Sequence, residues 1–409
     1  MPEFSEQFAG SYSHSVQVDG ITDWLTEQAL REPELTDLFD GCCRRLYSAG
    51  IPIGRAMLGY TTLHPLYQSK TLHWKLGETV TSVPHAHSEE PSPDWLKSPL
   101  YFMVHNRLNF MRRHLSGPDA LLDFEFLEDL KKDGYTDYLA YTITFQENFI
   151  HLNSVNASGV IGSWATKRPG GFSDADIRAL NRIQNQLAVA AKVRIKDEIA
   201  DNVMTTYLGP GAGKKVLSGQ IKRGDGDTIS AIVWYSDLRK STMLAEKLGA
   251  QQFIQLLNRY FECTADSILS NNGEVLRFVG DAVLAIFPMP TKSRSRRPGR
   301  NALAAVRAAI SSMHRLRAEG LPVQFGVGLH YGEVVYGNIG VASRLEFSVV
   351  GTTANEVARI EDLTKKIKVP VLISQSLAER LDCELQSKGT HNVKGVGKGV
   401  EVYTLPEFM

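Results

Sequence analysis

One stretch of the chain, from Ala231 to Phe287, decides the fold of the C-terminal half. It begins Ala231-Ile-Val-Trp-Tyr-Ser-Asp237-Leu-Arg-Lys-Ser-Thr and ends Gly273-Glu-Val-Leu-Arg-Phe-Val-Gly-Asp281-Ala-Val-Leu-Ala-Ile-Phe287. Both ends are apolar runs rich in Val and Ile, which is typical of buried strands, and each run carries one Asp where the chain turns. We therefore expect Asp237 and Asp281 to lie on neighbouring strands and to point at one place.

Two carboxylates that lie close together repel each other, which raises the pKa of one of them unless a cation sits between them. Oxygen ligands suit Mg²⁺ or Mn²⁺, and a pair of such ions can clamp the attacking and leaving oxygens of a phosphoryl group. An alternative stays open for each acid taken alone: Asp237 as a turn or helix-capping residue, and Asp281 as an ordinary hairpin Asp.

Five separated segments together are more specific than either acid. In this order and spacing they resemble the class III nucleotidyl cyclase catalytic domain, over about residues 225 to 405. The segments are Tyr235–Thr242, Gly273–Phe287, Gly328–Gly340, Val350–Arg359 and Asn392–Gly395.

The resemblance implies that a nucleoside triphosphate is cyclised: the ribose 3′-hydroxyl attacks the α-phosphate, and pyrophosphate leaves. Asp237 and Asp281 match the family's metal-binding acids, and the backbone carbonyl of Leu238 would complete the coordination. Two Mg²⁺ or Mn²⁺ ions per active site are expected as cofactors.

Three further positions match residues that bind the substrate in this family. Asn355 would orient the ribose, and Arg359 would stabilise the charge that develops on the α-phosphate. The two stand four residues apart in an expected helix, so they share a face. Lys394 matches a lysine that contacts the terminal phosphates. The alternative for Asn355 and Arg359 is an ordinary exposed helix pair.

Base selection is where the sequence departs from the family. The adenylate cyclases carry Lys where this chain has Arg277, and Asp or Thr where it has Ser348; guanylate-specific relatives carry Glu and a small polar residue. A cation at position 277 donates to N1 of adenine and cannot accept from the N–H groups of guanine, which favours ATP. Ser348 is compatible with either base.

In this family the metal acids of one protomer face the Asn and Arg of the other. Because one chain carries both sets, the resemblance implies a head-to-tail homodimer with two equivalent sites. The leading hypothesis is thus an adenylate cyclase. The alternatives are a guanylate cyclase and a catalytically silent cyclase fold that acts as a signalling module.

Composition narrows the class of protein further. A chain of 409 residues predicts more than one domain, and 45 basic against 45 acidic residues give no electrostatic reason to expect nucleic acid as a partner. No apolar run approaches the ~20 residues that span a bilayer, so no membrane is expected. Four cysteines without metal-ligand or redox spacing complete the expectation of a cytoplasmic protein.

The sequence predicts an α+β protein in four parts. These are a flexible arm over 1–19, a GAF-like regulatory domain over 20–190, a helical linker and hinge over 191–224, and the cyclase domain with a ferredoxin-like βαββαβ core over 225–409. The GAF resemblance depends on the strand and helix around Gly159–Asp176, where Ser173 and Asp176 form a capping-box pattern. An unknown small molecule is a possible ligand of that domain.

Local patterns predict several element boundaries. Pro33 should separate two helices. A hinge is expected over 209–215, with a short helix over 216–222 after it. A hairpin is expected over 323–331 and 333–339, and a helix over 353–363.

Overall fold

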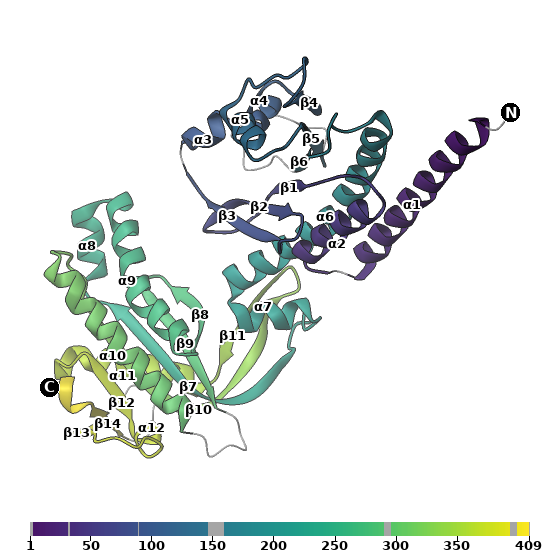
Figure 1. Cartoon of the computed structure of the whole chain (residues 1–409). Helices are drawn as coiled ribbons and strands as arrows, with labels where there is room; N and C mark the ends of the chain where they lie inside the picture. Colours follow the sequence, from purple (N-terminus) through teal and green to yellow (C-terminus); the bar gives the residue numbers. More distant parts are fainter. Residues whose placement is uncertain are drawn as a thin grey trace. The chain divides into compact units, whose positions relative to one another are not determined.

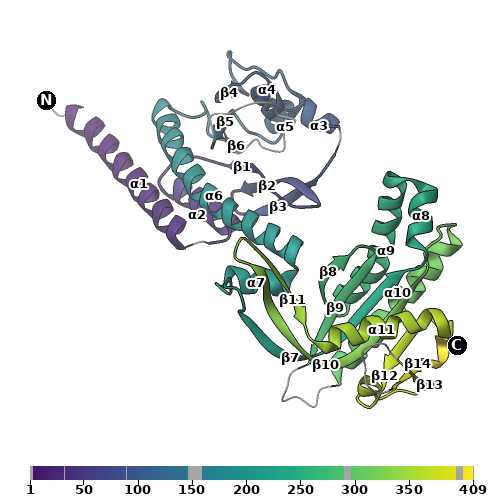
Figure 2. The same cartoon turned by 180° about the vertical axis from the view of Figure 1, so that it is seen from behind.

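The computed structural model describes residues 3–31, 33–88, 90–145, 159–289, 296–392 and 399–408, with side chains from residue 16 onward. The chain forms two compact units, Met1–Val203 and Met204–Met409, and each is described by itself. Both units combine helices with an antiparallel or mixed sheet (Figures 1 and 2), so the α+β prediction is confirmed.

The first unit is built on a six-stranded antiparallel sheet with the order β3-β2-β1-β6-β5-β4. Its strands are β1 (Arg55–Thr61), β2 (Tyr67–Lys75), β3 (Thr81–Ala86), β4 (Phe110–His114), β5 (Asp137–Thr144) and β6 (Gly159–Thr166). Its helices are α1 (Glu3–Arg31), α2 (Leu35–Ser48), α3 (Pro93–Leu96), α4 (Pro99–His105), α5 (Glu125–Lys132) and α6 (Asp174–Leu208), of which α6 continues past Val203.

This sheet carries a core on each face because side chains alternate along a strand. On β1, Ala56 and Leu58 pack in a core with α1, α2 and α6. Met57, between them, packs in the opposite core with α4 and α5. Figure 1 shows α2 and α6 along one face of the sheet and α4 and α5 on the other.

Three local predictions can be compared with the first unit. The break at Pro33 is confirmed, since α1 ends at Arg31 and α2 begins at Leu35. The capping box is confirmed too: the Ser173 N–H donates to Asp176 Oδ2 at 2.7 Å, and the Asp176 N–H donates to Ser173 Oγ at 3.3 Å. The arm expected over 1–19 is instead helical from Glu3, because no proline interrupts α1 and the helix continues into residues that pack on the core.

The second unit contains an eight-stranded sheet with the order β13-β14-β12-β10-β7-β9-β8, in which β11 pairs with β10. Its strands are β7 (Gly226–Leu238), β8 (Glu274–Val279), β9 (Ala282–Met289), β10 (Phe325–Val341), β11 (Arg344–Val350), β12 (Val371–Ser374), β13 (Gln386–His391) and β14 (Val400–Thr404). Its helical elements are α7 (Pro210–Leu217), α8 (Ser241–Leu248), α9 (Ala250–Ser270), α10 (Arg297–Ala318), α11 (Thr352–Ile367), α12 (Gln375–Ala378) and the 3₁₀ turn η1 (Pro406–Phe408).

The central strands follow the predicted β-α-β-β-α-β order, with β7, α9, β8, β9, α10 and β10 in sequence and β10-β7-β9-β8 side by side. Alternation along β7 separates two layers. Ile232 and Trp234 pack with α9 and α10, whereas Ala231 and Val233 pack in the opposite core, which includes a residue of α11. Asp237 has the parity of Val233, so β7 places it on the α11 side.

The hinge prediction over 209–215 is wrong for most of its length. Only Gly209, with φ +83, interrupts the helical conformation between α6 and α7. Helix α7 begins at the next residue, Pro210, whose missing N–H costs nothing in the first turn. Gly211 lets α7 approach β8 closely, because a Cβ there would lie 2.0 Å from Glu274 Oε1. The helix expected over 216–222 ends at Leu217.

The hairpin expected over 323–339 is also wrong, since β10 runs unbroken from Phe325 to Val341 and turns into β11 instead. Gly332 marks a close approach and not a turn: a Cβ on it would lie 2.5 Å from Thr353 Oγ1. The helix predicted over 353–363 extends to Ile367.

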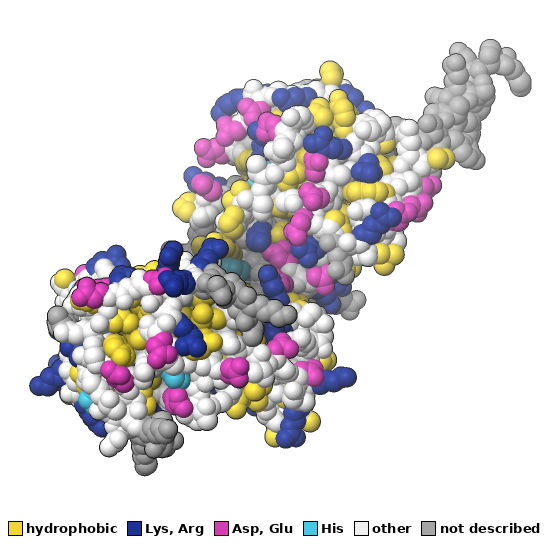
Figure 3. All heavy atoms as spheres, turned by 90° about the horizontal axis from the view of Figure 1, so that it is seen from below, with side chains coloured by type: hydrophobic (Ala, Val, Ile, Leu, Met, Phe, Trp, Pro, Cys, Tyr) yellow, Lys and Arg dark blue, Asp and Glu magenta, His cyan; other side chains and the backbone are white. Residues whose placement is uncertain are grey.

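Two properties concern the surface. Acidic and basic side chains alternate over the face seen in Figure 3, in line with the formal net charge of zero. Among the described residues, no helix has the length and apolar character to cross a bilayer.

Candidate active site

The two acids singled out by the sequence lie at one end of the central strands. Asp237 is paired in register with Ala282, the residue after Asp281, and the Leu238 N–H donates to the Asp281 carbonyl at 3.4 Å. Gly280, with φ +62, makes the tight turn between β8 and β9 that presents Asp281. The fold thus brings Asp237 and Asp281 together, as the alternation and spacing predict.

Electrostatics at this place fit a cation. Burial raises the pKa of Asp237, and the neighbouring Asp281 carboxylate raises it further, while Lys365 opposes the rise. Lys365, near the end of α11, donates from Nζ to Asp237 Oδ2 at 3.0 Å. The ammonium group of Lys365 therefore compensates part of the negative charge of the two acids.

The donor set also fits Mg²⁺ or Mn²⁺. Both side chains offer carboxylate oxygens, which are ligands that these ions prefer. Mg²⁺ is commonly held by one or two carboxylates, with substrate phosphates and water as its other ligands. The residues present therefore suit a metal that binds together with a polyphosphate. Coordination by the Leu238 carbonyl stays a prediction.

A buried ion pair joins Arg239, just after Asp237 in the chain, to Glu361. Arg239 Nη1 lies 2.8 Å from Glu361 Oε1, a carboxylate that is 1% exposed, and Arg239 also donates to Thr364. Burial raises the pKa of Glu361 to about 7, although Arg239 and Lys365 lower it. The pair fixes α11 to the end of β7. Sequence reasoning missed it, although Arg239 stands two residues after Asp237.

Asn355 and Arg359 lie on the exposed side of α11, four residues apart as predicted. Within the described residues, no hydrogen bond or ion pair joins either of them to Asp237 or Asp281. At 3.6 residues per turn, Arg359 and Lys365 point about 120° apart around the helix. Arg359 instead lies 3.9 Å from Asp362, the acid that Lys365 also contacts at 3.3 Å.

The expected base-selecting residues lie on β8 and β11. Arg277 Nη1 pairs with Glu346 Oε1 at 2.7 Å, a contact that the sequence analysis did not foresee. Ser348 is buried on β11, and its hydroxyl has no hydrogen-bond partner among the described residues. Lys394, the expected triphosphate-binding residue, lies outside the described residues.

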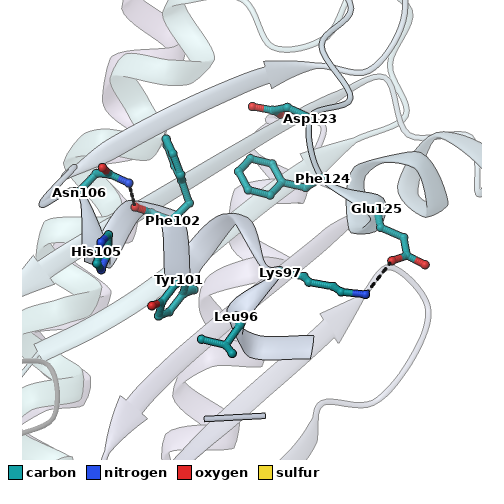
Figure 4. A pocket seen from close by; sticks show the side chains of 9 residues that line it. All are labelled: Leu96, Lys97, Tyr101, Phe102, His105, Asn106, Asp123, Phe124 and Glu125. Carbon is teal, nitrogen blue, oxygen red and sulfur yellow. Dashed lines mark hydrogen bonds and ion pairs between the residues drawn. The ribbon is translucent and has the colours of Figure 1, made fainter. Parts of the chain in front are cut away.

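The first unit contains a separate open groove of about 410 Å³ (Figure 4). Phe102 and Phe124 meet edge to face in it, with ring centroids 5.6 Å apart. Its polar side chains have partners: Asn106 donates to the Phe102 carbonyl at 2.8 Å, and Lys97 lies 3.9 Å from Glu125. The groove is mainly an aromatic hollow between α4 and the segment that leads into α5.

Comparison with known proteins assigns the class of the second unit. Residues 226–407 match the family described as adenylate and guanylate cyclase catalytic domain. This part of the chain is therefore a class III adenylate/guanylate cyclase catalytic domain. The match does not reach the first unit, for which the GAF-like assignment stays a prediction.

Two of the relatives each match less than half of the chain. An uncharacterised protein of Mycobacterium tuberculosis is 38% identical over 149 residues, which are 36% of this chain and 27% of that protein. An adenylate cyclase of Anabaena cylindrica is 28% identical over 195 residues, covering 45% of this chain and 38% of the relative. This chain thus matches only about a quarter to two fifths of the length of these relatives.

Solved structures with similarity include both kinds of cyclase. A bacterial light-regulated adenylyl cyclase has 27% identity and a TM-score of 0.40, with 45% of this chain and 93% of that chain covered. A guanylyl cyclase, Cya2, has 31% identity and a TM-score of 0.38, with 44% and 92% covered.

Proposed function

We propose that the chain is an adenylate cyclase that converts ATP to 3′,5′-cyclic AMP and pyrophosphate at sites shared across a homodimer. The observation that carries the proposal is the meeting of Asp237 and Asp281 at one end of β7 and β9, with a cationic side chain already held between β7 and α11. Two neighbouring carboxylates of this kind are what two-metal phosphoryl chemistry requires.

The residues of the site divide the work. Asp237 and Asp281 hold Mg²⁺ or Mn²⁺, which when bound supplies the Lewis acidity for activating the 3′-hydroxyl and neutralising the phosphates. Asn355 orients the ribose by hydrogen bonds from its amide. Arg359 donates paired N–H groups to the α-phosphate oxygens as negative charge develops there, and it stays protonated throughout. Lys394 contacts the terminal phosphates.

The proposed homodimer is supported by the partners of these residues. Among the described residues, neither Asn355 nor Arg359 contacts Asp237 or Asp281, so a second protomer would bring the two sets together. Large apolar side chains are exposed close to the acids, notably Phe278 and Val279 immediately before the Gly280–Asp281 turn. Exposed apolar groups at such a place favour a protein interface.

ATP is favoured over GTP because Arg277 is a donor-only side chain. The named adenylate cyclase of Anabaena cylindrica among the relatives supports the same choice. The cytoplasm is the compartment we propose, since ATP is the substrate and the four cysteines are free thiols.

The first unit is proposed to regulate the cyclase through α6. Tyr60 on β1 and Lys70 on β2 both pair with Glu198 of α6, so a change in this sheet can move the helix. The helix ends at Leu208, directly before α7, which packs on β8. A ligand in the groove of Figure 4 is one possible signal. Glu198→Gln should alter the cyclase rate and leave the preference for ATP unchanged.

The decisive experiment incubates the purified full chain with ATP or GTP and Mn²⁺ and identifies the product by chromatography. Cyclic AMP from the natural sequence, and none from Asp281→Ala, supports the proposal. Asp266→Ala, an exposed acid on α9, serves as the matched control and should be active. Cyclic GMP as the main product would favour the guanylate alternative, and no product from either nucleotide would favour a silent signalling module.

A further inference from the structure

The contact that the sequence did not predict, between Arg277 and Glu346, lies at the expected place of base selection. Arg277 comes from β8 and Glu346 from β11, and Nη1 and Oε1 are 2.7 Å apart. Both side chains are partly exposed, at 40% for Arg277 and 50% for Glu346, so a ligand can reach them. A cationic donor and an anionic acceptor therefore stand side by side on neighbouring elements.

Ser348, the residue expected to partner Arg277, is poorly placed to accept a hydrogen bond from a base. It is 0% exposed, and its hydroxyl is buried without a partner among the described residues. Glu346 stands two residues earlier on β11, and positions two apart on a strand project to the same side. The acceptor that Ser348 lacks is thus present on the same side of the same strand.

Unused hydrogen-bonding capacity remains at the pair. Only Oε1 of Glu346 has a partner within the described chain, which leaves Oε2 available. Arg277 Nε is buried and unpartnered in the described residues. Buried polar atoms are seldom left without a partner, so the buried Arg277 Nε and Ser348 hydroxyl beside an exposed donor-acceptor pair point to a ligand at this place.

We propose that Glu346 is a specificity-determining residue that accepts the hydrogen bond from the exocyclic 6-amino group of adenine, while Arg277 donates to adenine N1. This inference rests on the proposed cyclase function and deepens it. Adenine presents one acceptor next to one amino donor, which matches one donor next to one acceptor. Guanine could meet the same pair with O6 accepting from Arg277 and with the N1–H and 2-amino groups donating to the two oxygens of Glu346, so the rates with GTP decide between the two bases.

The test removes each half of the proposed hydrogen bond in turn. The full chain and its Glu346→Ala and Glu346→Gln variants are assayed with ATP, GTP and purine riboside triphosphate, which lacks the 6-amino group. In the natural sequence, loss of the amino group should lower kcat/KM about 10- to 100-fold, as expected for a hydrogen bond to a charged group. In Glu346→Ala, ATP and the purine analogue should be used equally well.

Controls separate this role from a structural one. Glu384→Gln, an exposed glutamate outside the site, should keep the full discrimination between ATP and the analogue. Equal discrimination in Glu346→Ala and the natural sequence would overturn the inference and leave the proposed function intact. A natural sequence that makes cyclic GMP in preference would overturn both.

Nucleotide binding decides the case in which the chain has no cyclase activity. If the full chain turned over no nucleotide, the proposed function would fail, and the same comparison would be made on dissociation constants for ATP and the analogue. Loss of discrimination on binding in Glu346→Ala would still support the role of Glu346, and unchanged discrimination would overturn it.

Discussion

Replacing Lys365 by Met tests whether the protein's own ammonium group competes with metal at the acidic site. Lys365 Nζ lies 3.0 Å from Asp237 Oδ2 and 3.3 Å from Asp362 Oδ1. A divalent ion that binds Asp237 competes with this ammonium for the same carboxylate. Methionine retains most of the apolar stem and removes only the charge, so the packing of α11 is disturbed little.

The expected magnitude is modest because the pair is partly exposed: the Lys365 side chain is 43% accessible and that of Asp237 24%. Ion pairs in such surroundings contribute about 0.2–1 kcal/mol. Removing the competing ammonium should therefore tighten Mn²⁺ binding about 1.4- to fivefold, since each 1.4 kcal/mol is about a factor of ten.

Isothermal titration of Mn²⁺ into the full chain without nucleotide measures this directly. Lys366→Met, the exposed neighbour on the same helix, is the matched control and should bind Mn²⁺ like the natural sequence. Equal or weaker binding by Lys365→Met would refute the reasoning and would show that Lys365 supports Asp237 instead of competing with metal.

Three further predictions concern stability. Arg112→Ala should lower the free energy of unfolding by about 3 kcal/mol, because the fully buried carboxylate of Asp137 loses its guanidinium partner and, among the described residues, keeps only the Phe172 N–H and, at 3.8 Å, His114. Arg113→Ala, which breaks a more exposed pair, should cost at most about 1 kcal/mol. Equal losses in urea unfolding would contradict this. Gly328→Ala should cost about 1–3 kcal/mol by overpacking β10 against α11, because a Cβ there would lie 2.7 Å from the Val357 carbonyl oxygen, and an unchanged midpoint would argue against that contact. Because burial raises the pKa of Glu361 from its ordinary 4.5 to about 7, the folded state binds a proton more readily than the unfolded state, so this residue's contribution to stability is lost as pH rises through about 7. Glu361→Gln should flatten that part of the pH profile, and an unaltered slope in unfolding experiments at pH 5 to 8 would disprove it.

The sequence was sufficient for features that depend on local periodicity. Alternation in the two apolar runs placed Asp237 and Asp281 at neighbouring strand ends, and the four-residue spacing placed Asn355 and Arg359 on one face of α11. These arrangements follow from strand and helix geometry alone.

Features that depend on tertiary contact were missed. Glu346 meets Arg277 across two strands that are 69 positions apart, which no local pattern records. The contact between Lys365 and Asp237 was not predicted, because the predicted helix ended at residue 363, two residues before Lys365. Gly332 was taken for a turn because glycine favours turns, whereas its missing side chain makes room for Thr353 of α11.

Complementation between two inactive variants tests the central claim most directly, namely that the acids of one protomer act with the amide and guanidinium of the other. Asp281→Ala and Arg359→Ala are each expected to be inactive as purified full chains. Co-expressed with different affinity tags, so that mixed dimers can be isolated, they should regain activity, since each mixed dimer holds one intact site of two. The isolated mixed dimers should show about half of the natural rate, and the unseparated random mixture about a quarter. Mixed dimers that form and still produce no cyclic nucleotide would contradict the account.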